Sequence, residues 1–269
     1  MGLNLSGAAA PTEFSILEFV DKVKEDLVKE GRSPLEFFDL DLEHVTVPEI
    51  WRPSGLRRCM RKQVYKAAKA PKDRVVYDAT RQHNFDRGHL FGAWFAAYVA
   101  ALEGRYGFEV VHRELVVFDS EARVGGKADI VLVRDGIKYV VEVKSKENAS
   151  AMSSIKKPAA LDLAQLNDYM HMTGAKAGWL VYFGVNFADS NSGKAKPRTQ
   201  VSAKEFFHQY SPSLWEDTCK KVQLLSWFLQ DQSKLAPKTA NTFFECPTCE
   251  WGGSCEKELA PKSVIEIAG

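Results

Sequence analysis

The sequence lacks any long apolar run. No stretch of about eighteen apolar residues occurs in the 269 residues, and no charged segment followed by an apolar one opens the chain. The first absence excludes a transmembrane helix, and the second argues against a secretory leader. We therefore expect a cytoplasmic protein that has no membrane partner.

An excess of charge is also missing. The chain carries 36 Lys and Arg against 35 Asp and Glu, a formal net charge of +1. This balance excludes a global basic field, so any contact with nucleic acid must come from local patches. The apolar content of 45% is ordinary for a globular protein, and the length suffices for one large domain or two small ones.

Cysteine is scarce, with five residues in the whole chain. In a cytoplasmic protein this argues against a disulfide framework and favours metal ligation or simple burial. The distribution is uneven. Cys246, Cys249 and Cys255 lie within ten residues, whereas Cys59 and Cys219 stand apart.

Hydrophobic periodicity and turn residues predict an α/β fold with a mixed central sheet flanked by helices. Helical spacing predicts helices over residues 14–30, 57–69, 85–104, 158–173 and 212–230. Runs rich in Val, Ile and aromatic residues predict strands over 109–118, 128–134, 137–143 and 178–185. We expect a single domain over 1–269, a catalytic core over 85–200 and a polar loop over 189–198.

The most informative segment is a predicted hairpin with an acid on each strand. Asp135-Gly136 favours a two-residue turn, which sets Arg134 opposite Ile137. Carrying this register outward sets Asp129 opposite Glu142, on one face of the sheet. Lys144 lies two residues beyond Glu142 and shares that face.

Two facing carboxylates destabilise a sheet unless a positive charge lies between them. Mg²⁺ or Mn²⁺ suits such a sparse site, because Mg²⁺ keeps several waters and takes only one or two protein carboxylates. An adjacent lysine is a usual companion in phosphodiester chemistry. Asp129 and Glu142 are the expected ligands, the Val143 carbonyl is a third oxygen, and Lys144 is placed to orient the attacking water.

The alternative is that Asp129 and Glu142 are solvated charges on an open sheet face. The apolar runs 130–133 and 139–141 argue against it, because they predict a sheet covered on both faces. A covered face does not hold an unpaired acid without a reason.

Gly126-x-x-Asp129 with Glu142-x-Lys144 resembles the PD-(D/E)xK nuclease superfamily, in particular its RecB-like branch. The resemblance implies metal binding by Asp129, Glu142 and the Val143 carbonyl, and it implies that Lys144 assists the attacking water.

Two further elements of that branch have counterparts here. Gln165 and Tyr169 are four apart on the helix after the Glu-x-Lys strand, and the resemblance implies that they contact DNA phosphate or support Lys144. It also implies a metal-binding His89 on a helix before the sheet, with His83 as a weaker candidate. The chain departs from the family where Gly92 replaces a second His, and His89 capping its helix is the alternative.

The three clustered cysteines, at x₂ and x₅ spacing, fit either zinc or an iron–sulfur cluster. Spacing alone leaves the fourth ligand open between Cys59 and Cys219. The segment around Cys59 resembles the one that carries the first cluster cysteine in RecB-like iron–sulfur nucleases, a group that includes the CRISPR-associated adaptation nuclease, the AddB nuclease domain and phage exonucleases. That resemblance implies a 4Fe–4S cluster, with zinc as the alternative.

Such a cluster would bring segments 50–70 and 240–258 together as a helical region formed from both chain ends. Its expected role is a structural staple rather than electron transfer. The neighbouring basic residues are expected to contact DNA phosphates, although a solvated helix face is the alternative. They are Arg57, Arg58, Arg61 and Lys62.

The resemblance implies a metal-dependent DNA nuclease, an exonuclease on single-stranded or end-frayed DNA. The alternatives are a catalytically weak DNA-binding or scaffolding subunit and an endonuclease. Partners of that branch are a helicase, a recombinase or a CRISPR or phage protein, and a phage-encoded chain would act in the host cytoplasm. The residues leave cleavage polarity, oligomeric state and pathway open.

Overall fold

The computed structural model describes residues 13–38, 51–74, 79–146, 151–186, 200–239 and 245–268. The chain divides into two compact units. Unit 1 comprises Met1–Val45, His83–Val117 and Lys127–Ser211, and unit 2 comprises Thr46–Gln82, Phe118–Gly126 and Pro212–Gly269. The single domain over 1–269 stays a prediction.

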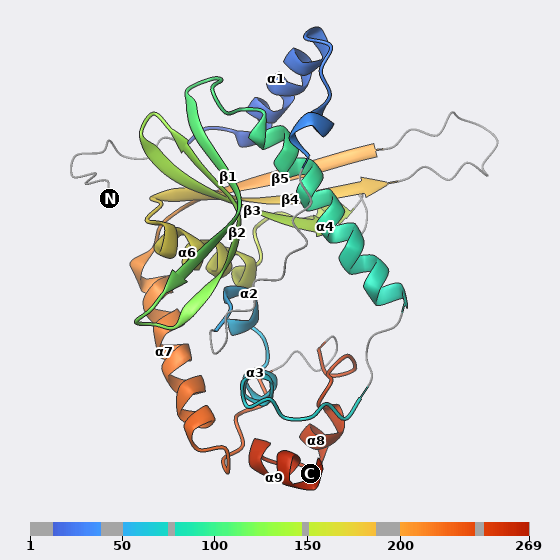
Figure 1. Ribbon diagram of the computed structural model, residues 1–269, viewed down its shortest axis with the longest axis vertical. Helices are drawn as coiled ribbons and strands as arrows, with labels where there is room; N and C mark the ends of the chain where they lie inside the picture. Colours follow the sequence, from blue (N-terminus) through green and yellow to red (C-terminus); the bar gives the residue numbers. More distant parts are fainter. Residues whose placement is uncertain are drawn as a thin grey trace, which may run out of the picture. The chain divides into compact units, whose positions relative to one another are not determined.

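A five-stranded mixed sheet forms the core of unit 1, in the order β1-β2-β3-β4-β5 (Figure 1). The strands are β1 Phe108–Asp119, β2 Val124–Arg134, β3 Ile137–Lys146, β4 Ala177–Asn186 and β5 Gln200–Gln209. β2 and β3 are antiparallel, β3 and β4 parallel, and β4 and β5 antiparallel. The predicted α/β class with a mixed sheet is confirmed.

Helices cover both faces of this sheet. α1 (Ile16–Lys29) and α4 (Ala79–Ala100) pack on one face, against Ile130, Leu132 and Val141. α6 (Ala160–Thr173) packs on the other (Figure 1). The core on that side contains Val131 and Val140 of the sheet together with residues of α6 and of the short α5 (Ala151–Ser154). Neighbouring residues of β2 and β3 therefore enter different cores, which explains their unbroken apolar runs.

The β2–β3 hairpin has the predicted turn and register. Asp135 and Gly136 both have positive φ, of 50° and 71°, as a type I′ turn requires. Arg134 pairs with Ile137, and the ladder continues outward to Ile130 opposite Val141.

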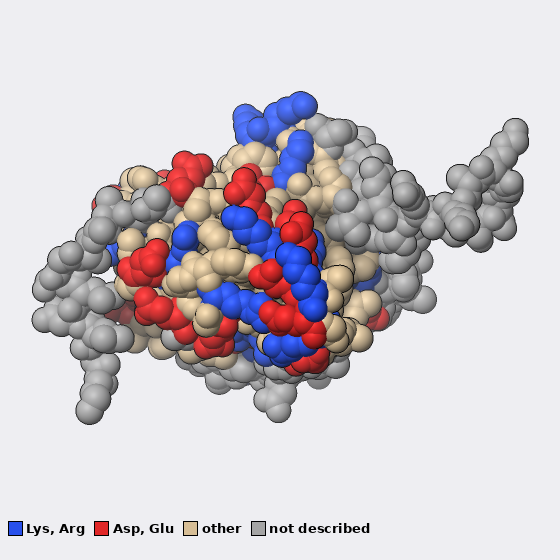
Figure 2. Space-filling view, turned by 90° about the horizontal axis from the view of Figure 1, so that it is seen from above, with Lys and Arg blue, Asp and Glu red and all other residues tan. Residues whose placement is uncertain are grey.

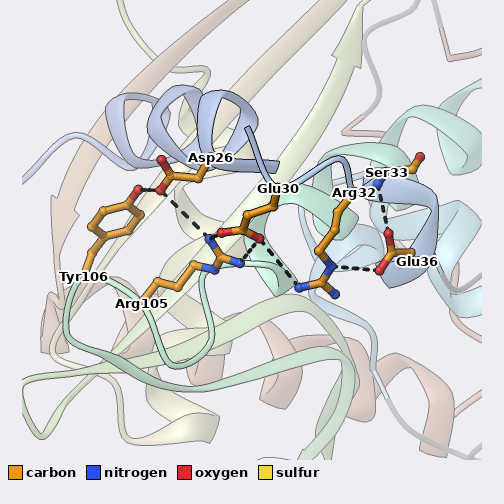
Figure 3. A network of polar contacts seen from close by, with 7 residues as sticks. All are labelled: Asp26, Glu30, Arg32, Ser33, Glu36, Arg105 and Tyr106. Carbon is orange, nitrogen blue, oxygen red and sulfur yellow. Dashed lines mark hydrogen bonds and ion pairs between the residues drawn. The ribbon is translucent and has the colours of Figure 1, made fainter. Parts of the chain in front are cut away.

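α1 is tied to the turn after α4 by a polar network (Figure 3). Arg105 forms a bidentate ion pair with Glu30, with both N–O distances 2.7 Å, and the Tyr106 hydroxyl donates to Asp26. Glu36 extends the network on the short helix Pro34–Phe37, where it accepts from Arg32 at 2.9 Å. Exposed pairs of this kind each contribute little, so the network mainly fixes the orientation of the helix end.

Unit 2 is largely helical. Its helices are α2 Pro53–Leu56, α3 Met60–Ala67, α7 Pro212–Gln230, α8 Gly252–Glu256 and α9 Pro261–Ala268. α3 packs against α7. In a separate small core Tyr65 stacks on Trp251, with ring centroids 6.1 Å apart.

Several predicted elements differ from the structure. α4 begins at Ala79 rather than at residue 85, and β5 and α5 were not predicted. β5 escapes detection because Phe206 and Phe207 are adjacent, so apolar and polar residues do not alternate cleanly along it. The predicted loop over 189–198 lies outside the described residues.

One face of the molecule agrees with the balanced composition. On the face shown in Figure 2, Lys and Arg are interspersed with Asp and Glu, and neither sign prevails. Within the described part of the chain, no helix has both the length and the apolar character to cross a bilayer.

Candidate active site and cysteine pocket

The end of the β2–β3 ladder brings the two predicted acids together. The Ile130–Val141 pair is at the outer end of the paired register. One residue before Ile130, the Asp129 side chain joins the two strands, because its Oδ2 accepts from the Val143 N–H at 2.8 Å. Asp129 is partly buried, and Glu142 is only 1% exposed. The hairpin register therefore places both acids in the interior, as predicted.

Glu142, Lys144 and Gln165 form a closed triangle of hydrogen bonds. Glu142 Oε1 accepts from Lys144 Nζ at 2.7 Å and from Gln165 Nε2 at 2.6 Å, and Lys144 Nζ also donates to Gln165 Oε1 at 2.9 Å. The second oxygen, Glu142 Oε2, is buried and has no hydrogen-bond partner among the described residues. A buried carboxylate oxygen without a donor is costly, and such an orphan calls for an explanation.

Charge is crowded in this interior. Burial raises the pKa of Asp129, against the opposing effects of Lys144, the Val143 N–H and His89. Burial and the neighbouring Asp129 together raise the pKa of Glu142 to about 8. Burial lowers the pKa of Lys144, but the two acids raise it more, so Lys144 stays a cation. When both acids are ionised, Lys144 alone does not neutralise them, and a divalent cation would.

The donor set fits a hard divalent cation. Carboxylate oxygens are the ligands that Mg²⁺ and Mn²⁺ prefer, and Glu142 Oε2 is an acceptor not used by the protein. Among the described residues, however, no three His, Cys, Asp or Glu side chains form a group that could hold an ion. The site is therefore a two-carboxylate site, which suits an ion that retains most of its waters.

His89 lies nearby but is not part of such a group. It is exposed on α4, and its charge lowers the pKa of Asp129. The adjacent Gly88 lies close to β3, because a Cβ added there would be 3.2 Å from Ser145 Oγ. A ligand role for His89 stays a prediction, and the side chain of His83 lies outside the described residues.

α6 supplies the remaining residues of the site. Tyr169 is 5% exposed within the core beneath the sheet, and burial followed by the charge of Glu142 raises its pKa. Asp162, one turn before Gln165 on α6, was not predicted. It accepts from the Tyr182 hydroxyl at 2.8 Å, and its charge contributes to the raised pKa of Glu142. In the sequence, only its spacing of three residues from Gln165, which makes the two side chains neighbours on the helix, could have indicated that it lies near the site.

In unit 2, four of the five cysteines line one pocket. They are Cys59, Cys246, Cys249 and Cys255. Burial raises the pKa of the Cys249 thiol, and the nearby Cys59 and Cys255 add to this rise. Cys219 on α7 does not line the pocket.

The segments that carry these cysteines are joined by direct hydrogen bonds. The Trp251 indole donates to the Ala70 carbonyl at 2.9 Å. The Asp73 carboxylate accepts from the Gly253 N–H at 3.1 Å and from the Ser254 hydroxyl at 2.5 Å. These contacts fix the start of α8 against the chain that follows α3.

Of the four basic residues expected to contact DNA, three have hydrogen-bond or ion-pair partners within the protein. Arg57 donates to the Thr218 hydroxyl, and Arg58 pairs with Glu245 at 3.4 Å. Arg61 donates into the cysteine pocket, which Lys62 also lines. Their contact with DNA stays a prediction.

No protein-family model and no curated protein matches the chain. Solved structures that resemble it include SSO0001, with 16% identity over 93% of this chain and all of that chain, at a TM-score of 0.45. An alkaline exonuclease from Laribacter hongkongensis has 14% identity over 68% of this chain and 89% of its own, at 0.42. A phage-related exonuclease from Haemophilus somnus has 13% identity over 71% and 96%, at 0.41. At these scores the likeness carries no conclusion about activity, which must come from the site.

Proposed function

We propose that the protein is a metal-dependent DNA nuclease that acts as an exonuclease on single-stranded or end-frayed DNA. The observation that carries the proposal is the buried Glu142 Oε2, which has no partner among the described residues although Lys144 and Asp129 are its neighbours. A structural carboxylate would be expected to satisfy both oxygens, whereas a metal ligand keeps one for the ion.

Asp129, Glu142 and the Val143 carbonyl would hold Mg²⁺ or Mn²⁺. When bound, the ion supplies Lewis acidity and neutralises charge on the phosphodiester. Lys144 stays protonated between Glu142 and Gln165, and from there it orients the attacking water and offsets phosphate charge. Gln165 fixes the Lys144 ammonium, so that the side chain loses little entropy on substrate binding.

For the cysteine pocket we propose a structural 4Fe–4S cluster held by Cys59, Cys246, Cys249 and Cys255. A single zinc ion needs four ligands around one point, each sulfur about 2.3 Å from the metal. In a 4Fe–4S cluster each thiolate binds a different iron atom, and the four thiols that line the pocket match this ligand count as they match that of zinc, which stays the alternative.

A catalytically weak scaffolding subunit is the alternative. It does not need an ordered lysine or a free carboxylate oxygen, and the connected Glu142–Lys144–Gln165 triangle therefore favours the enzyme. An endonuclease would use the same site, and only the product pattern separates it from an exonuclease. A helicase, a recombinase or a CRISPR or phage protein remains the expected kind of partner.

The test is anaerobic purification followed by cleavage of end-labelled single- and double-stranded DNA with Mg²⁺ or Mn²⁺. Lys144→Ala should lower the cleavage rate by about 10²- to 10⁴-fold while DNA binding persists. Lys138→Ala is the matched control, because Lys138 lies on the same strand and donates to the Thr173 carbonyl at 2.7 Å, away from the acids. Equal rates for the two variants would place the chemistry elsewhere.

A second pair of variants tests the metal. Asp129→Asn should abolish metal-dependent cleavage, whereas Asp135→Asn, in the exposed turn of the same hairpin, should not. A brown preparation with iron and sulfide supports the cluster, and a colourless one with zinc contradicts it. Stepwise loss of end nucleotides supports an exonuclease, and internal fragments contradict it.

A further inference from the structure

Arg61 is held inside the cysteine pocket by three hydrogen bonds. Its Nε donates to the Ala236 carbonyl at 2.8 Å, and its Nη1 donates to the carbonyl and to the Sγ of Cys255, each at 3.3 Å. The guanidinium is partly buried and spans from α3 to α8. A fork anchored at both ends has little freedom left to reach a DNA phosphate outside the pocket.

The nearby Arg58 provides a contrast. Arg58 also lies near the pocket, because it pairs at 3.4 Å with Glu245, which lines the pocket. Its side chain is 59% exposed, however, and its bond goes to a carboxylate rather than to sulfur. The two arginines thus supply a similar charge near the pocket, but Arg61 alone of the two donates to a cysteine sulfur.

A hydrogen bond to a ligating sulfur changes the properties of an iron–sulfur cluster. The donor draws negative charge from the thiolate, and hydrogen bonds to sulfur are among the features that set the reduction potential. Residues that orient a ligand are also important for retention of the metal. A cationic donor acts in both ways, because it stabilises the thiolate and favours the more negative, reduced state of the cluster.

We propose that Arg61 is a positioning residue for the cluster, holding the Cys255 sulfur in place through its Nη1–H···Sγ bond and so setting how firmly the cluster is retained and how readily it is reduced. The inference rests on the proposed 4Fe–4S cluster. It replaces the expected DNA contact of Arg61 with a contact to the cluster ligand, and it leaves Arg58 as the residue of the pair whose side chain faces solvent.

The test compares Arg61→Met with Arg58→Met in the full-length protein, purified anaerobically. Methionine keeps an apolar side chain of comparable length but removes the charge and all donors. The readouts are iron and sulfide per chain, the rate of iron release to a chelator, and the midpoint potential from a dithionite titration followed by electron paramagnetic resonance. Circular dichroism confirms that each variant is folded.

Arg61→Met should release iron about 10- to 100-fold faster than the wild type and shift the midpoint potential to a more negative value. Arg58→Met should stay within about twofold of the wild-type release rate, since it breaks only an exposed ion pair. Arg61→Lys restores a positive donor and should recover part of the potential. If Arg61→Met does not fold, Arg61→Lys takes its place as the test variant. Its midpoint potential should then be more negative than that of the wild type.

Failure of the inference differs from failure of the proposed cluster. If the wild-type protein contains no iron and sulfide, the cluster itself is refuted. If the wild type is loaded but the Arg61 variants match Arg58→Met in release rate and potential, the cluster stands and the role of Arg61 is refuted.

Discussion

Replacing Glu142 with Gln should stabilise the metal-free protein. Folding buries the Glu142 carboxyl and raises its pKa from 4.5 to about 8, so at pH 7 the folded protein holds a proton that the unfolded chain has released. pH 7 lies about 2.5 units above the ordinary pKa, and each unit corresponds to about 1.4 kcal/mol. Glutamine is neutral in both states, so Glu142→Gln should gain about 3 kcal/mol at pH 7.

The gain should depend on pH in a defined direction. Because the folded pKa of Glu142 is raised, its contribution to stability is fully present below pH 4.5 and is lost as the pH rises toward 8. The advantage of Glu142→Gln should therefore shrink to below about 1 kcal/mol at pH 5. The glutamine Oε1 can still accept from Lys144 and Gln165, so the triangle is not the source of the difference.

The assay is urea unfolding at pH 5 and pH 7 in the presence of EDTA, followed by tryptophan fluorescence and circular dichroism. Asp135→Asn is the control, because its carboxylate is exposed and its stability should stay within about 0.5 kcal/mol of the wild type. Adding Mg²⁺ or Mn²⁺ should stabilise the wild type and not Glu142→Gln. A variant less stable than the wild type at pH 7 without metal, or an advantage independent of pH, would refute this reasoning.

Two other substitutions test the scaffold. Gly178→Ala should lower the free energy of unfolding by about 1–3 kcal/mol, because the new Cβ would lie 2.3 Å from the Val140 carbonyl oxygen and would force β3 and β4 apart. The measurement is thermal or urea unfolding, and a midpoint equal to that of the wild type would contradict this. Asp73→Ala should cost about 1 kcal/mol, because the carboxylate caps the start of α8. Burial raises the pKa of Asp73, but hydrogen bonds from Ser254 and Gly253 lower it more. The difference in unfolding free energy between Asp73→Ala and the wild type should therefore fade in acid, as this carboxylate is protonated. A difference that does not change with pH would refute the cap.

The sequence was sufficient to predict the parts of the fold that depend on local pattern. The turn at Asp135-Gly136 fixed the hairpin register, and with it the meeting of Asp129 and Glu142. The bounds of α7 agree with the predicted helix over 212–230, and α6 ends just before Gly174 as expected. In each case a few neighbouring residues determine the outcome.

Other features depend on segments that are distant in sequence and could not be predicted. β5 is recognisable only through its pairing with β4, because its own residues alternate poorly. The sulfur contact of Arg61 needs α3, Ala236 and α8 to meet. Spacing on α6 marked Gln165, but only packing of that helix on β3 reveals that it holds both Lys144 and Glu142.

The hairpin that joins the two acids limits the insertions and deletions that the protein can tolerate. Because side chains alternate between faces along a strand, a single-residue insertion or deletion between Asp129 and Glu142 would turn one acid toward the opposite core. Substitutions at Asp135 or Lys138 leave the register intact. We therefore expect natural variants of this segment to differ in composition but to keep its length, and a length change here to remove activity even when every residue of the site is retained.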